Sequence, residues 1–266
     1  MLTSARRREI LRRVAEEGHV EARVLAADLG VDSSTIRRDL DALARAGQLD
    51  RVHGGARSGG RAVAEVPYTV KQHERLAQKA AIAVAALDLV TDGMSVILDS
   101  GSTTYQVALA LRARRGLTVV TNDLRAAKML ASVPELRLLV TGGELLGSVF
   151  TLAGPAAEAF LADVRVDLTF LGADAIDPEA GITNTNGLEV PLKRAMLAAA
   201  DTGVVCADSS KFGHRALVRV AGLAEVDLVL TDDELSEESA RPYGSTLRRV
   251  PVPAGPPALV DPEVGP

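Results

Sequence analysis

Short runs rich in Val, Ile and Leu alternate with helical segments along most of this 266-residue chain, and this alternation restricts the fold more than any other feature. The runs have the length and β-branched content of buried strands. Strands are predicted over residues 95–99, 117–121, 136–140, 167–172, 203–207 and 227–231. Helices are predicted over residues 70–90, 104–114, 123–132, 155–163 and 188–201. Strands that alternate with helices favour an α/β layer with a largely parallel sheet.

The N-terminal 56 residues follow another pattern, with helices predicted over 3–17, 21–29 and 32–46 and a strand over 48–53. Gly30-Val31 predicts a tight turn, and Asp32 is a suitable N-cap for the third helix. The apolar stripes expected to face the core are Ile10, Leu11 and Val14, then Val24, Leu25 and Leu29, then Ile36, Leu40 and Leu43. Three helices followed by a strand is the order of a winged helix-turn-helix.

The expected fold class is therefore α/β, with an N-terminal winged helix-turn-helix and a larger α/β domain built on a largely parallel sheet. The predicted boundaries are 1–56 for the winged helix-turn-helix, 57–69 for a Gly-, Ala- and Arg-rich linker, and 70–250 for the α/β domain. Residues 251–266 hold six of the twelve prolines, which predicts an extended or disordered tail.

Composition narrows the protein class. The chain is 47% hydrophobic and 24% charged, a globular balance that excludes wholesale disorder. No apolar run reaches the roughly 18 residues of a membrane span, and the charged start lacks a signal-peptide segment. A single cysteine, Cys206, excludes an internal disulfide. These features predict a cytoplasmic protein with no membrane partner.

Charge is distributed unevenly: residues 1–61 carry a net charge of +3 and the remainder −8, within the total of −5. A basic N-terminal part and an acidic remainder indicate that only the N-terminal part binds a polyanion.

The third helix has the layout of a DNA-reading helix. When its apolar stripe faces inward, a step of about 100° per residue turns Arg38 almost straight outward. The alternative is a solvated amphipathic helix with charge pairs such as Arg37–Asp41, but the preceding helix and Gly turn favour DNA reading. For His53 alone, a surface role is as good an interpretation. The residues expected to contact DNA are Ser33, Ser34, Thr35, Arg37, Arg38, Arg51 and His53.

Residues 7–56 closely resemble the DeoR family of bacterial transcription regulators. The segments Thr35-Ile-Arg-Arg-Asp-Leu40 and Arg51-Val-His-Gly-Gly55 match that family's recognition helix and wing. The departures are small: Asp32 stands where the family often has Ser, and Gln48 where Leu is usual. The resemblance implies binding to double-stranded operator DNA.

A hydroxyl-rich segment, Asp99-Ser-Gly-Ser-Thr-Thr104, joins a predicted strand to a predicted helix. Backbone N–H groups, hydroxyls and the positive end of a helix dipole suit a phosphate there; the alternative is a tight βα turn with a Thr cap. Polar residues follow other predicted strands at Thr121-Asn122, Thr141-Gly142-Gly143 and Gly172-Ala173-Asp174, where open α/β sheets gather ligand residues. Lys193 and Lys211 supply positive charge for an anion.

These segments also resemble the effector domain of DeoR regulators, most specifically at 171–177, 191–196 and 207–213, so the resemblance covers about residues 5–250. In the family this domain is similar to ribose-5-phosphate isomerase and binds phosphorylated sugars that release the protein from DNA. The resemblance implies that residues 101–104 form the phosphate loop, with Asp174, Lys193 and Lys211 facing the sugar. The residues expected to bind the effector are Asp99, Gly101, Ser102, Thr103, Thr104, Thr121, Asn122, Gly142, Gly143, Asp174, Lys193 and Lys211.

The likeness to an isomerase raises the question of catalysis. The isomerase has a pair of acids at this strand end, but here Leu171 replaces the first of them, and a glycine-rich run is replaced by Gly181-Ile-Thr-Asn-Thr-Asn-Gly-Leu188. A regulator (most often a repressor) without enzyme activity, metal or cofactor is therefore expected, with Cys206 as plain core. The alternatives are a sugar-phosphate isomerase with a fused head and an adaptor that only oligomerises. A homo-oligomer, dimer or tetramer, is expected because paired half-sites supply specific DNA affinity.

Overall fold

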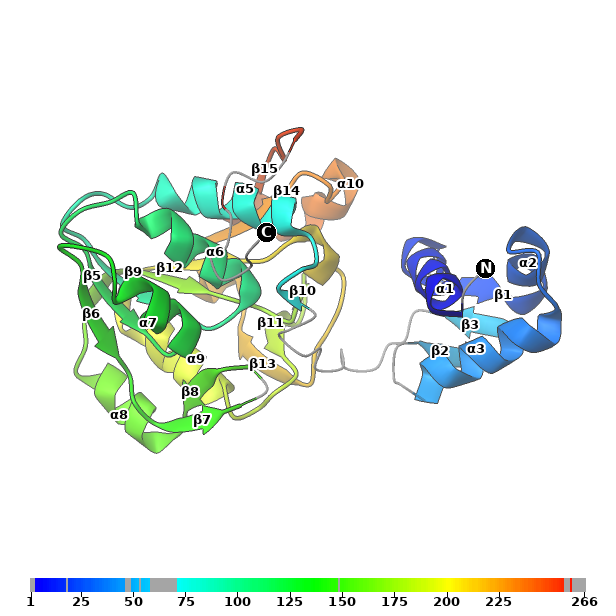
Figure 1. Cartoon of the computed structure of the whole chain (residues 1–266), viewed down its shortest axis with the longest axis horizontal. Helices are drawn as coiled ribbons and strands as arrows, with labels where there is room; N and C mark the ends of the chain where they lie inside the picture. Colours follow the sequence, from blue (N-terminus) through cyan, green and yellow to red (C-terminus); the bar gives the residue numbers. More distant parts are fainter. Residues whose placement is uncertain are drawn as a thin grey trace. The chain divides into compact units, whose positions relative to one another are not determined.

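The computed structural model describes residues 3–17, 19–45, 49–52, 54–57, 71–147, 149–255 and 259. The chain divides into two compact units whose main boundary falls between Ala64 and Glu65 (Figure 1). The smaller unit has its own hydrophobic core, and the larger unit has two more.

The smaller unit is a winged helix-turn-helix. Its elements are α1 (Thr3–Glu17), β1 (His19–Glu21), α2 (Ala22–Asp28), α3 (Ser33–Arg45), β2 (Asp50–Val52) and β3 (Gly55–Arg57). The three strands form an antiparallel sheet in the order β1-β3-β2. The expected strand over 48–53 is β2, but β1 and β3 were not predicted. Three residues are too few to show an alternating pattern, so sheet pairing alone defines these strands.

The predicted apolar stripe of α3 is confirmed. Ile36 and Leu40 are fully buried and Leu43 is 4% exposed, and all three join one core with Ile10 and Val14 of α1.

The stripe predicted for α2 is wrong at one position, because Val24 is 51% exposed. The buried side chains are Ala22, Leu25 and Ala26, with Leu29 packed partly against them. These four follow the i, i+3, i+4, i+7 spacing of one helix face, and Val24 lies one residue off it.

The turn between α2 and α3 forms at Gly30, whose φ is +63°, a left-handed conformation that favours glycine. The Val31 N–H donates to the Ala26 carbonyl at 3.1 Å. Asp32 precedes α3 as expected, but its backbone carbonyl, rather than its carboxylate, accepts from Thr35 and Ile36. The turn therefore ends α2 and starts α3 through backbone hydrogen bonds.

The larger unit is built on a seven-stranded sheet in which every pairing is parallel. In sheet order its strands are β15 (Leu247–Val250), β14 (Leu228–Asp232), β12 (Ala200–Cys206), β9 (Val166–Leu171), β4 (Ser95–Leu98), β5 (Thr118–Thr121) and β6 (Arg137–Val140). All six predicted strands are present. The edge strand β15 was not predicted, because two of its four residues are arginine and it lacks the apolar run of an inner strand.

The predicted helices are also present, all of them shorter than expected. They are α5 (Leu76–Leu87), α6 (Ser102–Leu111), α7 (Leu124–Leu130), α8 (Pro155–Ala162) and α9 (Val190–Ala198). Two smaller antiparallel sheets, a short helix and three 3-10 turns were not predicted: β7 (Glu144–Leu146) with β8 (Thr151–Ala153), β10 (Ala175–Asp177) with β11 (Gly181–Asn184) and β13 (Val218–Ala221), α10 (Glu237–Ala240), η1 (Ser209–Lys211), η2 (Leu223–Glu225) and η3 (Arg241–Thr246).

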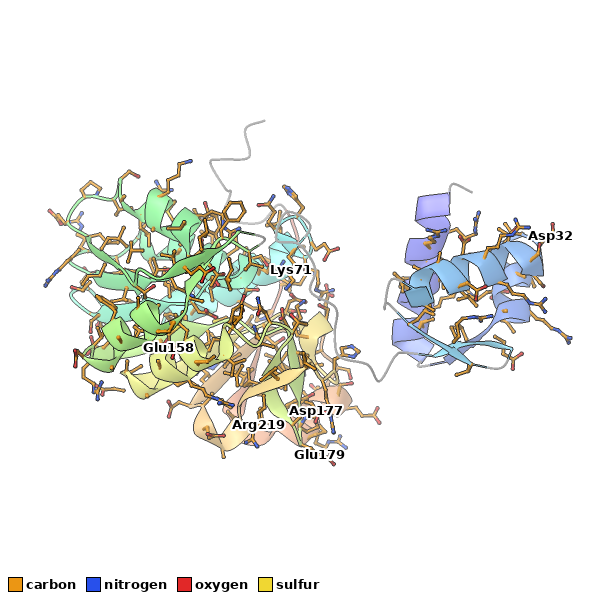
Figure 2. All side chains as sticks on the ribbon, turned by 90° about the horizontal axis from the view of Figure 1, so that it is seen from below. Asp32, Lys71, Glu158, Asp177, Glu179 and Arg219 are labelled. Atoms are coloured by element: carbon orange, nitrogen blue, oxygen red, sulfur yellow. The ribbon has the colours of Figure 1, made fainter. Side chains whose placement is uncertain are left out.

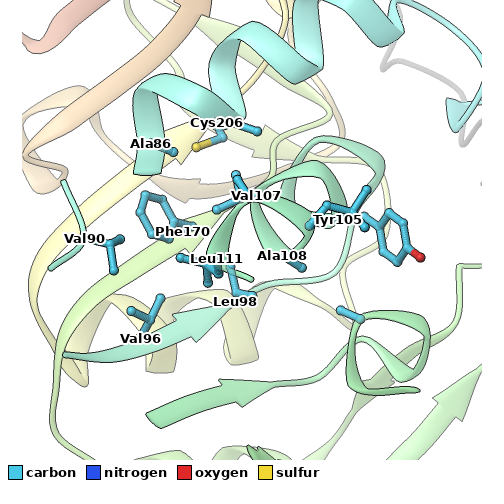
Figure 3. Close-up of a cluster of buried hydrophobic side chains, with 14 of the residues drawn as sticks. Ala86, Val90, Val96, Leu98, Tyr105, Val107, Ala108, Leu111, Phe170 and Cys206 are labelled. Atoms are coloured by element: carbon cyan, nitrogen blue, oxygen red, sulfur yellow. The ribbon is translucent and has the colours of Figure 1, made fainter. Parts of the chain in front are cut away.

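Helices cover both faces of the main sheet. Val96 and Leu98 of β4 pack in one core with residues of α5, α6 and α7. Figure 3 shows Leu98, Phe170 and Cys206 in this core. Ile97, which alternation along the strand turns to the opposite face, packs in the second core with residues of α8 and α9.

The strand order reverses direction beside β4. From β4 the chain adds β5 and β6 on one side, then returns to place β9, β12, β14 and β15 on the other. In open parallel sheets a ligand crevice forms at the carboxyl ends of the strands where this reversal occurs. Here that point lies between the ends of β4 and β9.

Residues 251–255 of the predicted tail have no helix or strand, and the Val252 N–H donates to Asp233 at 3.2 Å. Most of 256–266 lies outside the described residues. In the described parts of the chain, no helix has both the length and the apolar character needed to cross a membrane.

Candidate functional site

A pocket lies at the carboxyl ends of β4 and β9, where the strand order reverses. Residues 100–103 after β4 and 172–174 after β9 form much of its wall. Six of the residues expected to bind a ligand line it: Gly101, Ser102, Thr103, Asp174, Lys193 and Lys211.

One wall of the pocket is the N-terminus of α6. The helix begins at Ser102, two residues earlier than predicted, so Ser102 and Thr103 form its first turn. Gly101 precedes the helix with φ +152°, and a Cβ there would lie 3.2 Å from the Thr104 hydroxyl. The side chains of Ser102 and Thr103 make no hydrogen bond to any other described residue. Free hydroxyls and the unpaired N–H groups of a first helical turn together suit an anion.

A buried ion pair joins the two strand ends behind this wall. The Lys193 ammonium, 3% exposed, donates to the Asp99 carboxylate and, at 3.1 Å, to the Gly172 carbonyl. Asp99 also accepts the Gly172 N–H at 2.9 Å. Burial alone would lower the pKa of Lys193, but the charges of Asp99 and Glu189 raise it above its ordinary value. Lys193 is therefore held as a cation.

A second ion pair, Lys71 with Asp174, also belongs to the pocket lining. Asp174 accepts from Lys71 at 2.7 Å and from the hydroxyl and N–H of Thr185 at 2.6 and 2.9 Å. Burial opposes the charged form, but Lys71 and Thr185 together hold the pKa of Asp174 well below its usual range. Asp174 is therefore ionised.

Lys211 is the pocket cation with the most hydrogen-bonding capacity left. It ends the short η1 turn, and its ammonium makes no hydrogen bond or ion pair with another described residue. Although burial opposes it, the charge of Lys211 contributes to a lowered pKa of the buried Asp208. All three N–H donors of Lys211 are thus available to a ligand.

The other expected ligand residues do not line the pocket. Thr104 donates to the Gly101 carbonyl at 3.1 Å, and Thr121 donates to the Leu98 carbonyl at 2.8 Å. Asn122 is buried, with its side-chain NH₂ 3.4 Å from the Leu152 carbonyl. Gly142 and Gly143 lie in the loop between β6 and β7. Asp99 does not line the pocket itself but contacts two lining residues, Lys193 and Gly172.

Among the pocket residues that were not candidates, three have a charged or amide side chain: Lys71, Asn184 and Glu189. The Asn184 side chain donates to Glu189 at 2.7 Å, and its own oxygen is buried without a partner. Burial raises the pKa of Glu189 to about 7. Asn184 and Glu189 fall in or next to the polar run 181–188. The sequence analysis noted this run only because it replaces a glycine-rich run of the isomerase, and this did not mark it as a ligand site. Lys71 carries no sequence signal, because 103 positions separate it from Asp174.

Cys206 belongs to the core, as predicted, and also contacts the pocket. Burial raises the pKa of its thiol, so Cys206 is not a thiolate nucleophile. No cluster of three or more potential metal ligands occurs among the residues that the structure describes.

The exposed face of α3 carries the side chains expected to read DNA. Ser34, Arg37 and Arg38 are exposed, and Ser33 and Thr35 are half-buried. Neither arginine makes a hydrogen bond or ion pair with another described residue. An apolar back with unpaired arginines in front matches a helix that enters the major groove.

Two other charged residues of the motif have structural partners. Asp39 is 3% exposed and accepts from Arg6 at 2.6 Å and Arg7 at 2.9 Å, which joins α3 to α1. Arg51, expected to contact phosphates, donates to Asp41 at 2.8 Å and to the Gly55 carbonyl, which joins the wing to α3. His53 lies outside the described residues.

Comparison with known proteins assigns both units. A family model described as "DeoR-like helix-turn-helix domain" matches residues 6–61, and one described as "DeoR C terminal sensor domain" matches residues 74–233.

Similar proteins match along nearly their whole length. "HTH-type transcriptional regulator GlpR" of Haloferax volcanii is 36% identical over 90% of this chain and 93% of its own. "Glycerol-3-phosphate regulon repressor" of Haemophilus influenzae is 34% identical over 88% and 91%. "HTH-type transcriptional repressor CsqR" of Escherichia coli is 33% identical over 85% and 86%. Among solved structures, ribose 5-phosphate isomerase A of Methanocaldococcus jannaschii overlaps 50% of this chain and 53% of its own at a TM-score of 0.36 and 24% identity.

Proposed function

The chain belongs to the DeoR family of transcriptional regulators, and we propose that it is a cytoplasmic repressor that a phosphorylated sugar or polyol releases from operator DNA. The observation that carries the ligand half is the pocket between β4 and β9, where the first turn of α6 and Lys211 leave donors unpaired. The observation that carries the DNA half is the pair of unpaired arginines on α3.

In the DNA half, Arg38 contacts a base edge or a nearby phosphate, and Arg37 and Arg51 contact mainly phosphates. Ser33, Ser34 and Thr35 lie at the N-terminus of α3, where short side chains reach the backbone and base edges. Arg51 already holds Asp41 and Gly55, so it positions the wing as well as supplying charge.

In the ligand half, the phosphate binds at the first turn of α6, to the N–H groups and hydroxyls of Ser102 and Thr103, with Lys211 as counter-ion. Asp174, Asn184 and Glu189 then face the hydroxyl groups of the ligand. Carboxylate and amide oxygens accept from hydroxyls, which explains why acids line a pocket for an anion. The name of one relative, a glycerol-3-phosphate regulon repressor, supports a small phosphate ester as the effector.

The protein acts as a dimer or tetramer joined through its larger unit. One winged unit makes a small contact with DNA, and two half-sites supply specific affinity. Light scattering at micromolar concentration measures this, and a monomer with and without operator DNA contradicts it.

A sugar-phosphate isomerase is the second candidate, and one observation favours it. Glu189 is a pocket carboxyl whose pKa burial raises to about 7, a value suited to a general base. Leu171 argues the other way, because a fully buried leucine occupies the position of one acid of the isomerase. The relatives are named regulators, and we propose no enzyme activity. Direct assay of the purified protein with pentose and hexose phosphates decides between the two.

The effector half is tested with the double variant Ser102→Ala/Thr103→Ala. It removes two hydroxyl donors and leaves Gly101 and the DNA-binding unit unchanged. The probes are inorganic phosphate, glycerol 3-phosphate, ribose 5-phosphate, fructose 1-phosphate, fructose 6-phosphate and glucosamine 6-phosphate, first in a thermal-shift screen of the wild type. We expect the double variant to bind operator with near wild-type affinity and to remain bound when the stabilising compound is added.

Each result has a distinct meaning. Operator affinity that falls to the non-specific level makes the α6 turn structural. An unchanged response places the phosphate elsewhere, near Lys193 and Lys211. No stabilisation by any of the six compounds favours an adaptor that binds no effector.

A further inference from the structure

Lys71 connects the pocket to the N-terminal end of the larger unit. It lies in the pocket wall, where its ammonium donates to Asp174 at 2.7 Å, and the two side chains are 20% and 13% exposed. Figure 2 labels Lys71 on the larger unit. Along the chain, Lys71 directly follows residues 58–70, which connect it to β3 of the helix-turn-helix unit.

The backbone around Lys71 is fixed to the sheet-covering helix α5. The ammonium of Lys79, 3% exposed, donates to the carbonyls of Lys71 at 2.5 Å and Glu74 at 2.7 Å. Both acceptors belong to residues 71–75, which we call the anchor turn. A buried ammonium that loses such acceptors is left desolvated without partners, so the backbone of the anchor turn resists displacement.

The last residue of the anchor turn, Arg75, is held by ion pairs of its own side chain. Arg75 has φ +54°, a left-handed conformation that is costly for a residue with a side chain. Its guanidinium contacts Asp208 at 3.0 Å, Asp232 at 3.2 Å and Glu234 at 2.7 Å. Asp208 precedes the η1 turn that carries Lys211. Arg75 thus joins the anchor turn to a second wall of the pocket.

The Lys71–Asp174 pair leaves hydrogen-bonding capacity on one partner only. Both oxygens of Asp174 are engaged, one by Lys71 and the other by Thr185. An ammonium has three donors, and Lys71 uses one within the described residues. The Lys71 ammonium therefore has two further donors that an anionic ligand in the pocket can accept from.

We propose that Lys71 is a ligand-contacting residue through which a phosphorylated compound in the pocket acts on the chain segment that leads to the DNA-binding unit. The inference rests on the proposed function and adds the route by which binding changes operator affinity. A ligand shifts an equilibrium only through different contacts in two states, and Lys71 supplies such a contact at the start of that segment. Lys79 and Arg75 are positioning residues, because they hold the anchor turn and so fix the place of Lys71 in the pocket wall.

The test uses the full chain with Lys71→Met, which keeps the length of the side chain and removes its charge. Lys128→Met, at an exposed position in the last turn of α7 and outside the pocket lining, is the matched control for loss of one positive charge. The probe is whichever of the six phosphate compounds stabilises the wild type most. Calorimetry measures its binding, and operator titration with and without it gives a release factor, the ratio of the two operator dissociation constants.

We expect the probe to bind Lys71→Met within about tenfold of the wild-type affinity, because the α6 turn and Lys211 remain. The release factor of Lys71→Met is expected to fall towards 1, whereas Lys128→Met keeps the wild-type value. Asp174→Asn, which retains an acceptor for Thr185 but removes the charge opposite Lys71, is expected to change the release factor while operator binding without probe persists.

A wild-type release factor in Lys71→Met overturns the proposal, because the ligand then acts without Lys71. Loss of all probe binding in Lys71→Met also overturns it, because Lys71 is then needed for binding itself and no separate effect on operator affinity can be assigned to it. If the proposed function itself is wrong, the thermal-shift screen shows this before any variant is made. No probe then stabilises the wild type, and the inference about Lys71 is also wrong. A direct binding measurement on each variant separates these outcomes.

Discussion

The two units hold their functional cations in opposite ways. On α3, Arg37 and Arg38 are exposed and unpaired, whereas Lys193 and Lys71 in the pocket are buried or nearly so and each donates to a carboxylate. Exposed, unpaired arginines can neutralise DNA phosphates directly. Each neutralised phosphate releases a cation that was condensed on the DNA, and this release adds to the binding affinity. In the pocket, the most buried cation, Lys193, needs a protein partner before a ligand arrives, whereas Lys211, which is partly exposed, has none among the described residues.

The same difference separates structural from functional charges within the smaller unit. Arg6 and Arg7 are engaged by Asp39, and Arg51 by Asp41, so these residues hold helices and wing together. Arg37 and Arg38 have no partner among the described residues, as expected of side chains that contact DNA, whereas Arg51 combines its place in the wing with the phosphate contact proposed for it.

Breaking the buried pair is expected to have the largest effect. Lys193→Met leaves the Asp99 carboxylate buried without its cation, and removing one partner of such a pair costs about 3–5 kcal/mol of folding free energy. Chemical unfolding measures it. The double variant Asp99→Asn/Lys193→Met, which buries no unpaired charge, should recover much of that loss. If Lys193→Met is as stable as the wild type, the pocket charges are solvated like those of α3 and the contrast between the units fails.

The second prediction uses pH to test the burial of the pocket acid. Glu189 has its pKa raised by burial from 4.5 to about 7, so the folded state binds the proton more tightly than the unfolded chain. Its contribution to stability is full below pH 4.5 and is lost as the pH rises to about 7. Glu189→Gln should remove about 3 kcal/mol of this pH dependence.

The measurement is the difference in unfolding free energy between wild type and variant at several pH values, in which the other titrating groups cancel. Glu144→Gln, on the exposed strand β7, is the control and should leave the difference flat. A flat difference for Glu189→Gln as well means that water reaches this carboxyl.

The smallest expected effect is on operator affinity, from a change on the exposed face of α3. Arg38→Ala should weaken operator binding by about 1–3 kcal/mol if Arg38 makes a bidentate base contact, with no loss of folding stability because the side chain has no partner within the fold. Arg38→Lys separates reading from charge, since lysine keeps the charge but cannot make the bidentate contact. Fluorescence anisotropy with operator and scrambled DNA measures both. Unchanged operator affinity in Arg38→Ala would show that another face of α3 meets the DNA.

Much of the molecule could be predicted from sequence where local periodicity carries the signal. The apolar positions 36, 40 and 43 of α3 repeat with the helical period, so their burial and the outward direction of Arg38 follow from geometry alone. Five of the six predicted strands are inner strands, marked by Val, Ile and Leu because both faces of a parallel sheet are buried, and the sixth, β6, is an edge strand. Gly101-Ser102-Thr103 stood out because a strand and a helix flank it. The motifs resembled the DeoR family, and comparison confirmed the membership.

What the tertiary structure decided are the pairings between residues far apart in the chain. Sequence placed Asp99, Asp174, Lys193 and Lys211 in one site, but it could not assign Lys193 to Asp99 or Lys71 to Asp174, which lie 94 and 103 positions apart. Thr121 and Asn122 follow a strand as ligand residues do, yet they are buried in the fold, because the strand order reverses beside β4 and not beside β5. Periodicity fixes which side of an element a residue occupies, since that depends only on neighbours in the chain. Which carboxylate meets which ammonium depends on strand order and helix packing, and these form only when the whole core is assembled.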